Sequence, residues 1–208
     1  MTVDRHRLAR PALLVAPQLV GAVLVSESEL GRVAIRLTEV EAYEGADDPA
    51  SHAFRGRTAR TAVMFGPAGH LYCYFTYGMH WCANVVCGVD GVAAAVLLRA
   101  GEVIDGVDVA RARRPAARRD TDLARGPARL ATCLGLDRDT NGVDLCAADS
   151  PIRLETMPAR RRSGVVAGPR VGITVATENA WRFWLDGAPT VSAFKPGGSK
   201  RRRTAPAD

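Results

Sequence analysis

The chain has little lysine and no long apolar run. Of its 28 basic residues only Lys195 and Lys200 are lysines, and both lie near the C-terminal end, which disfavours chemistry through a lysine amine in a folded core. The longest uninterrupted apolar run, 92–98, has seven residues, whereas a membrane-spanning helix needs about 20. With 47% hydrophobic and 24% charged residues, the composition excludes a disordered tail protein, a collagen-like fibre and a coiled coil. The length of 208 residues fits one large domain.

Cysteine is also scarce, and its spacing matches neither a disulfide framework nor a zinc site. The five cysteines cannot all pair, and none forms a C-x-x-C motif, which favours a reducing cytoplasm. The chain lacks P-loop and G-x-G-x-x-G motifs, and its serine–glycine segments have no partner base, so nucleotide-hydrolysing and serine-nucleophile interpretations fail. The H-E-x-x-H spacing of a zinc site is also absent. His52 follows Asp47 and Asp48 without metal-ligand spacing, and Pro49 makes the segment an irregular loop. We expect no metal and no cofactor.

The N-terminus resembles a secretion signal only in part. Three arginines within the first ten residues precede an apolar stretch, 11–25. Pro17 and Gln18 interrupt that stretch, and no small-x-small cleavage site follows it. We therefore expect a cytoplasmic protein without a membrane segment.

Positive charge and aromatic rings concentrate in different parts of the chain. Residues 1–102 contain 9 basic and 10 acidic residues, whereas residues 103–208 contain 19 and 12. Of the 12 aromatic residues, 8 lie between Tyr43 and Trp81. Rings for stacking and positive charge are what a nucleic acid requires of its partner. A GC-rich genome explains arginine in place of lysine, but it does not explain the excess of basic over acidic residues.

Alternation of apolar and polar residues predicts a largely β first half and a more helical second half. In the strand expected at 32–43, the side chains at 33, 35, 37, 39, 41 and 43 share one face. The expected helices are 13–19, 110–119 and 127–134 with Gly135 as C-cap, and the other strands are 21–25, 70–76, 80–87, 93–100, 165–176 and 181–186, with turns at 26–31 and 88–91. Together they predict one α+β domain, 11–194, between an N-terminal arm, 1–10, and a basic, disordered tail, 195–208.

Two carboxylates follow the apolar positions of the strand at 32–43. Glu39 and Glu41 come after three apolar side chains on that face and precede Tyr43. If the face stays inward, the buried charge is costly, and a carboxylate there acquires a raised pKa that suits a general base. If the strand emerges into solvent at Glu39, both side chains are ordinary surface residues. The pattern alone favours neither interpretation.

An aromatic residue occupies the tip of the hairpin expected at 77–79. Tyr77 stands beside Gly78 and Met79, where exposed polar residues are usual. Such a tip suits a wedge that enters a base stack. It equally suits a tip that folds back onto the protein or onto a partner copy.

Several short segments together resemble one known family. They are TEVEAY (38–43), SH (51–52), VMFGP (63–67), YCYFTYGMHWCANVV (72–86), VLLRA (96–100), RVGI (170–173) and WRF (181–183). In this combination they closely resemble the alkyladenine (3-methyladenine) DNA glycosylase family, over about 11–194. The chain departs from the family pattern in its tail beyond Lys195 and in a short, arginine-rich connection, 110–129.

The resemblance implies a monofunctional DNA glycosylase of base excision repair. Such an enzyme flips an alkylated or deaminated purine (3-methyladenine, 7-methylguanine or hypoxanthine) out of double-stranded DNA and hydrolyses its N-glycosidic bond. The resemblance also implies a curved, mostly antiparallel β-sheet flanked by helices, with a protruding β-hairpin that inserts into DNA. We further expect a bacterial monomer that associates with the nucleoid through DNA.

The resemblance assigns catalytic roles to two residues. Glu41 would be the general base that activates water for attack at C1′ of the flipped nucleotide, and Arg99 would hold Glu41 or the water. Glu39, on the same face, is interpreted as structural. A lyase step would need an amine for a Schiff base, and because only Lys195 and Lys200 offer one, we expect a hydrolase without lyase activity.

The resemblance also assigns residues to the DNA. An aromatic slot would stack on the extruded base, formed by Tyr43, His52 and Tyr74. Asn84 would lie on its floor and clash with the exocyclic amine of normal guanine. Tyr77, next to Met79 in the hairpin, would fill the gap left in the duplex.

Two alternative functions differ from this hydrolase in what they require of the carboxylates. A non-catalytic module that recognises damaged or unpaired bases would share the rings and the basic second half, but Glu41 would be dispensable. A glycosidase acting on free sugars would need Glu39 and Glu41 on either side of a bond. Neighbours at i and i+2 on one strand are too close together for that arrangement.

Overall fold

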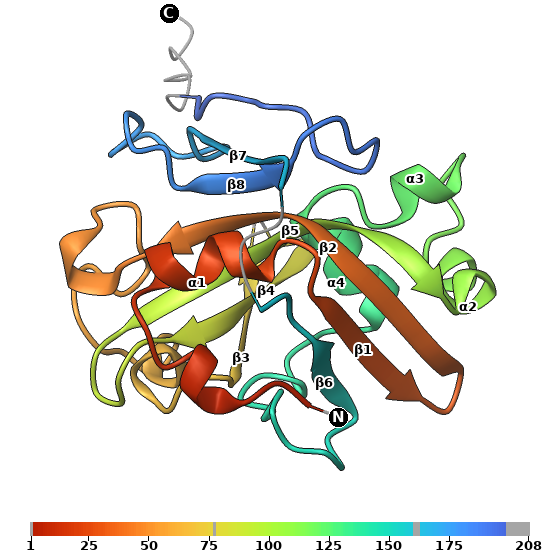
Figure 1. The fold of residues 1–208 in the computed structure, drawn as a ribbon, viewed down its shortest axis with the longest axis horizontal. Helices are drawn as coiled ribbons and strands as arrows, with labels where there is room; N and C mark the ends of the chain where they lie inside the picture. The colour runs from red at the N-terminus through yellow and green to blue at the C-terminus, as the bar shows by residue number, and fades with distance from the viewer. Residues whose placement is uncertain (1, 77, 160–162, 199–208) are drawn as a thin grey trace, which may run out of the picture.

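Antiparallel strands form the body of the molecule, and short helices pack around them (Figure 1). The computed structural model describes residues 2–76, 78–159 and 163–198. Within them, one curved sheet has the strand order β3-β4-β5-β2-β1-β6, while β8 pairs with β2 and β7 with β8. All of these pairs are antiparallel. The predicted α+β fold is confirmed.

The strands follow the chain as β1 (Val23–Ser28), β2 (Gly31–Tyr43), β3 (Leu71–Thr76), β4 (His80–Cys87), β5 (Ala94–Asp105), β6 (Ile152–Thr156), β7 (Val165–Gly168) and β8 (Arg182–Leu185). The α-helices are α1 (Ala12–Leu19), α2 (Val107–Arg113), α3 (Asp120–Leu123) and α4 (Pro127–Leu134), and short 3-10 turns occur at η1 (Arg5–Arg7), η2 (Gly45–Asp47) and η3 (Ala62–Phe65). No helix in the described part of the chain is long and apolar enough to span a membrane.

A bulge in β2 reverses which of its side chains face the core. The core takes the side chains at 33, 35 and 37 from the first half of the strand, but those at 40 and 42 from the second half. The register between β2 and β5 shifts on both sides of Glu39, which accounts for the change of phase. The prediction that the side chains at alternate positions from 33 to 43 all share one face is therefore wrong. Glu39, Glu41 and Tyr43 lie on the sheet face opposite the apolar core.

Helix α4 matches its predicted bounds because its ends carry strong signals. Gly126 precedes Pro127, which suits the first helical position, and Gly135 closes the helix in the left-handed conformation at φ 68°. The Gly135 N–H donates to carbonyls of the last turn. Helix α4 packs on β4 and β5, and α1 packs on β2, so both helices cover the core face of the sheet.

The predicted and observed elements differ in several places. The strand expected at 21–25 continues to residue 28, because the hairpin turn is tighter than the 26–31 expected. The helix expected at 110–119 runs instead over Val107–Arg113, since Pro115 disfavours helical backbone at the residue before it. Pro169 follows directly on β7, which ends at 168 instead of 176. Strand β6, which pairs with β1, was not predicted.

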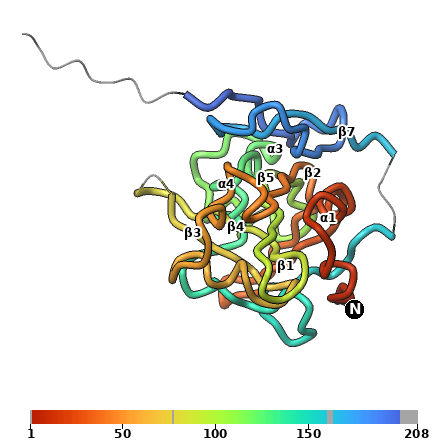
Figure 2. Tube along the Cα trace, turned by 90° about the vertical axis from the view of Figure 1, so that its left-hand side faces the viewer, coloured from red at the N-terminus to blue at the C-terminus, as the bar shows by residue number. Residues whose placement is uncertain are grey.

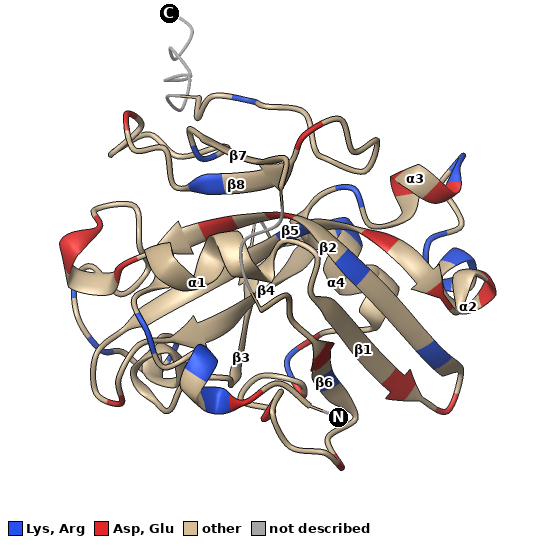
Figure 3. Ribbon diagram, viewed as in Figure 1, with Lys and Arg blue, Asp and Glu red and all other residues tan. Residues whose placement is uncertain are grey.

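The C-terminal segment forms a second layer above the sheet. In both views of the chain, β7, β8 and the segments around them lie together across one side of the sheet (Figures 1 and 2). Strand β8 pairs with β2 at Glu39–Glu41, where the acidic stretch of β2 lies next to the basic start of β8 (Figure 3). At the other end of the chain, Val3 and Leu8 join the core. Residues 199–208 of the expected tail lie outside the described residues.

Candidate active site

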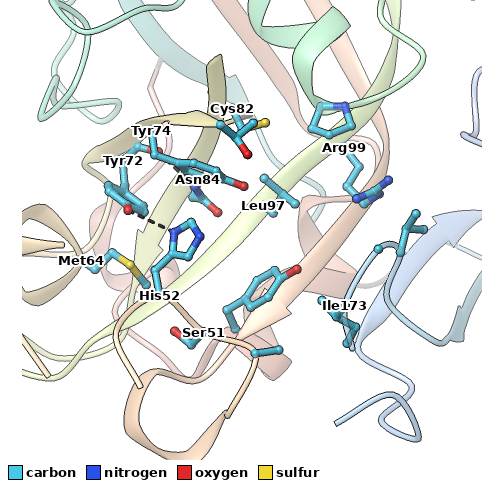
Figure 4. Close-up of a pocket in the computed structure, with 16 residues that line it drawn as sticks. Ser51, His52, Met64, Tyr72, Tyr74, Cys82, Asn84, Leu97, Arg99 and Ile173 are labelled. Carbon is cyan, nitrogen blue, oxygen red and sulfur yellow. Dashed lines mark hydrogen bonds between the residues drawn. The ribbon is translucent and has the colours of Figure 1, made fainter. Parts of the chain in front are cut away.

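A cavity of about 240 Å³ lies on the sheet face opposite the core (Figure 4). Side chains from strands β2 to β5 line it, together with the loop at 50–52 and the segment at 171–173. It brings together five of the site residues expected from the sequence, namely Tyr43, His52, Tyr74, Asn84 and Arg99. A sixth, Glu41, is fully buried and bonds to three residues of the cavity wall.

One wall of the cavity is a cluster of aromatic rings. The His52 ring meets the Tyr74 ring edge-on, with centroids 4.5 Å apart. Tyr72 stacks on Tyr74 at 5.6 Å, and its hydroxyl lies 3.2 Å from His52 Nδ1 (Figure 4). Burial, with a smaller contribution from the charge of Arg60, lowers the pKa of His52, so the imidazole is neutral at pH 7. The wall therefore offers uncharged rings for stacking.

Asn84 fixes a polar group on the cavity floor. It lies in β4 opposite Tyr72, and its Nδ2 donates to the Tyr72 carbonyl oxygen at 3.1 Å. Leu97 of β5 pairs with Asn84 and adds an apolar contact beside it (Figure 4). Because one amide hydrogen is held by the backbone, the orientation of the Asn84 side chain is constrained.

Glu41 accepts hydrogen bonds from three donors on three different segments. The Tyr43 hydroxyl and Arg99 Nη1 lie 2.9 and 3.3 Å from its Oε2, and the Val171 backbone N–H lies 2.7 Å from its Oε1. Burial raises the pKa of Glu41, while the Arg99 charge and the hydrogen bonds from Val171 and Tyr43 oppose this rise. The result is a buried carboxylate that is held in place and is more basic than usual.

Glu39 is the centre of a second buried network, which shares Arg99 with Glu41. Its Oε1 accepts from Arg182 Nε at 2.7 Å, Arg99 Nε at 3.0 Å and the Ser192 hydroxyl at 2.9 Å. Its Oε2 accepts from the Ser192 N–H at 2.7 Å. Arg99 thus bridges both carboxylates of β2, while Glu39 ties the sheet to the C-terminal layer. This geometry agrees with the structural interpretation of Glu39.

Sequence reasoning missed the contribution of the C-terminal layer to this site. Val171 was noted only as part of the RVGI segment, and Arg182 and Ser192 were given no role. Their signal in the sequence is weak, because they lie more than 100 residues from the carboxylates that they contact, Val171 on Glu41 and the other two on Glu39, and tertiary contacts of the C-terminal layer bring them there. Tyr72 did have a signal, since it alternates with Tyr74 on one face of β3.

A basic groove of about 450 Å³ adjoins the cavity and shares Arg99 with it. Its other positive side chains are Arg125, Arg129 and Lys195. Met79, at the β3–β4 hairpin, is 68% exposed, whereas Tyr77 lies outside the described residues. Among the described residues, no group of three His, Cys, Asp or Glu side chains is arranged to hold a metal ion.

Comparison with known proteins gives consistent matches over most of the chain. A family model described as methylpurine-DNA glycosylase matches residues 6–189. A protein of Streptomyces avermitilis is 53% identical over 204 residues, covering 97% of this chain and 96% of its own length. A protein of Nocardia farcinica is 54% identical over 185 residues, covering 86% and 85%. Both carry the name "Putative 3-methyladenine DNA glycosylase".

Proposed function

The chain belongs to the methylpurine-DNA glycosylase family, and on this premise we propose that it is a monofunctional glycosylase of base excision repair. Its proposed substrates are 3-methyladenine, 7-methylguanine and hypoxanthine in double-stranded DNA. The observation that carries the proposal is Glu41, a buried carboxylate of raised pKa bonded to three residues of an aromatic cavity.

The cavity suits a purine that has been flipped out of the duplex. Tyr43, His52 and Tyr74 supply ring faces and edges, and His52 carries no charge that would repel a cationic base. An N3- or N7-alkylated purine is positively charged and electron-poor, so it stacks well on electron-rich tyrosine rings. Asn84, held by the Tyr72 carbonyl, would collide with the exocyclic amine of guanine and so disfavour the normal base. 7-Methylguanine carries the same amine, and its excision would depend on its cationic ring, which weakens the glycosidic bond.

Glu41 would act as the general base of hydrolysis. A carboxylate can accept about four hydrogen bonds. Protein donors supply three to Glu41, so one acceptor position remains for a water molecule. The water oxygen bonds to C1′ while Glu41 takes its proton, and the electron pair of the N-glycosidic bond leaves with the purine. An alkylated purine departs as a neutral base and needs no strong acid catalyst. Negative charge at Glu41 would also stabilise the oxocarbenium-like sugar.

The DNA around the flipped nucleotide would contact the basic groove and the hairpin. Arg125, Arg129 and Lys195 adjoin the cavity and would bind phosphates, which position the strand without reading the lesion. Exposed Met79 would lie against the duplex at the hairpin, and Tyr77 would fill the vacated position in the stack. The alternative, a non-catalytic binding module, would use the same contacts but would have no need of Glu41.

We expect excision to proceed without metal and without a covalent intermediate. Release of the free base should be unchanged in EDTA, and borohydride should trap no protein–DNA adduct, because Lys195 lines the adjoining groove and not the cavity, and Lys200 lies outside the described residues. The measurement is chromatography of released base from lesion-containing duplex, with gel analysis of the borohydride-treated sample. Loss of activity in EDTA that a divalent ion restores, or a trapped adduct, would contradict the proposed hydrolysis.

The pH profile should report the pKa of Glu41. A protonated Glu41 cannot accept a proton from water, so excision should fall as the pH decreases through its pKa, which burial has raised. Tyr43→Phe removes a hydrogen bond that favours the charged form, so the acid limb should move to higher pH. Excision rates measured from pH 4 to 9 test this. If the pH profile of Tyr43→Phe coincides with that of the wild type, protonation of Glu41 does not cause the loss of excision at low pH.

A further inference from the structure

An arginine is stacked between two aromatic rings directly beside the base cavity. The guanidinium carbon of Arg170 lies 4.6 Å from the ring centroid of Tyr43 and 4.9 Å from that of Trp181. Arg170 is wholly buried, whereas Tyr43 lines the cavity. A base that stacks on Tyr43 would therefore use the ring face away from Arg170, with the tyrosine ring between the base and the guanidinium.

The charge of this arginine is compensated by a single buried carboxylate. Asp48 bonds to Arg170 through both of its oxygens, at 2.5 and 2.8 Å, and neither side chain is exposed. The Ala42 carbonyl accepts a third hydrogen bond from Arg170. The Arg170 Nε has no hydrogen-bond partner among the described residues. The guanidinium is thus oriented by Asp48, one carbonyl and two rings.

The position of the pair makes its net charge important for the ligand. Arginine stays protonated in proteins, so without Asp48 a full positive charge would lie one ring away from the bound base in a buried, weakly screened environment. Such a charge would repel a cationic alkylated purine and would have little effect on neutral hypoxanthine. The Asp48 carboxylate and the Arg170 guanidinium together carry no net charge.

We propose that Asp48 and Arg170 determine specificity by keeping the rear of the Tyr43 ring electrically neutral, so that the cavity admits cationic as well as neutral purines. This inference rests on the proposed function and adds which residues determine the substrate class of that enzyme. The pair also holds the segment that brings the Val171 N–H to Glu41, so a purely structural loss would affect every substrate alike. A loss of charge balance would instead change the ratio between substrates.

The test compares excision of 7-methylguanine and hypoxanthine from otherwise identical duplexes, each corrected for spontaneous base loss without protein. Asp48→Asn keeps the size of the side chain but leaves the Arg170 charge uncompensated. Its 7-methylguanine to hypoxanthine ratio should fall roughly tenfold below that of the wild type. The double variant Asp48→Asn/Arg170→Gln removes both charges, and its ratio should return toward the wild-type value.

Two outcomes in the variants of Asp48 would overturn the inference. One is an equal loss for both substrates in Asp48→Asn; the other is a ratio that the double variant does not restore. If Asp48→Asn does not fold, Arg170→Gln still tests the inference. Removing the cation should leave the ratio of 7-methylguanine to hypoxanthine excision unchanged or raise it. A fall in that ratio would contradict the inference. If the wild type excises neither base, the proposed function fails instead.

Discussion

Glu41→Gln should reduce excision of a damaged purine by roughly 10²–10⁴-fold, the usual contribution of a general base, while the affinity for lesion-containing duplex stays close to that of the wild type. The amide keeps the size of the side chain but cannot take a proton from water. The glutamine NH₂ group would face one or more of the three donors that bond to Glu41, which would destabilise the fold. A thermal melt of the variant should therefore be recorded alongside the kinetics.

Glu44→Gln is the matched control for this experiment. Glu44 accepts a hydrogen bond from the Leu13 backbone N–H, which a glutamine oxygen also accepts, and we place it outside the base cavity. Its excision rate should equal that of the wild type. Activity of Glu41→Gln within tenfold of the wild type would remove Glu41 from the role of general base.

Glu39→Gln should lower the free energy of unfolding by roughly 3–5 kcal/mol, as expected when a buried ion pair loses one partner. Two buried guanidiniums, those of Arg99 and Arg182, lose the charge they share, and the link between β2 and the C-terminal layer weakens. Excision by the folded fraction should fall less than in Glu41→Gln. Denaturant unfolding, with excision assayed in the same preparation, measures both effects.

The control for Glu39→Gln is Glu102→Gln. Glu102 pairs with Arg36 on the sheet, but their side chains are 54% and 41% exposed. Exposed pairs of this kind contribute about 0–1 kcal/mol, so the unfolding free energy should hardly change. If Glu39→Gln left stability intact and abolished excision, the catalytic carboxylate would be Glu39 and not Glu41.

Most of the site residues could be named from the sequence because their short motifs resemble a known family, whereas spacing alone gave them no role. Alternation did predict that Tyr72, Tyr74 and Thr76 share one face of β3, and all three line the cavity. Helix α4 was predicted with its bounds because proline and glycine mark its two ends. In these segments local backbone preference and tertiary packing favour the same structure.

The burial of Glu41 could not be predicted because it depends on contacts distant in sequence. The register shifts around Glu39 arise where β2 meets β5 and β8, and they turn both carboxylates away from the apolar core. The layer that then covers them supplies Val171 and Ser192. From the sequence, Glu41 could be either a buried general base or a surface residue at a solvent-exposed strand end, and the choice had to stay open.

The most direct test of the proposed hydrolase is to measure base release and DNA binding in the same samples. Wild-type protein is incubated in EDTA with duplexes that carry 3-methyladenine, hypoxanthine or no lesion. A hydrolase of this kind should release a free, intact purine from each lesion duplex and leave an unbroken strand with an abasic site. It should release no base from undamaged DNA. Tight binding to both lesion duplexes without any released base would contradict it and would identify a module that recognises damage without repairing it.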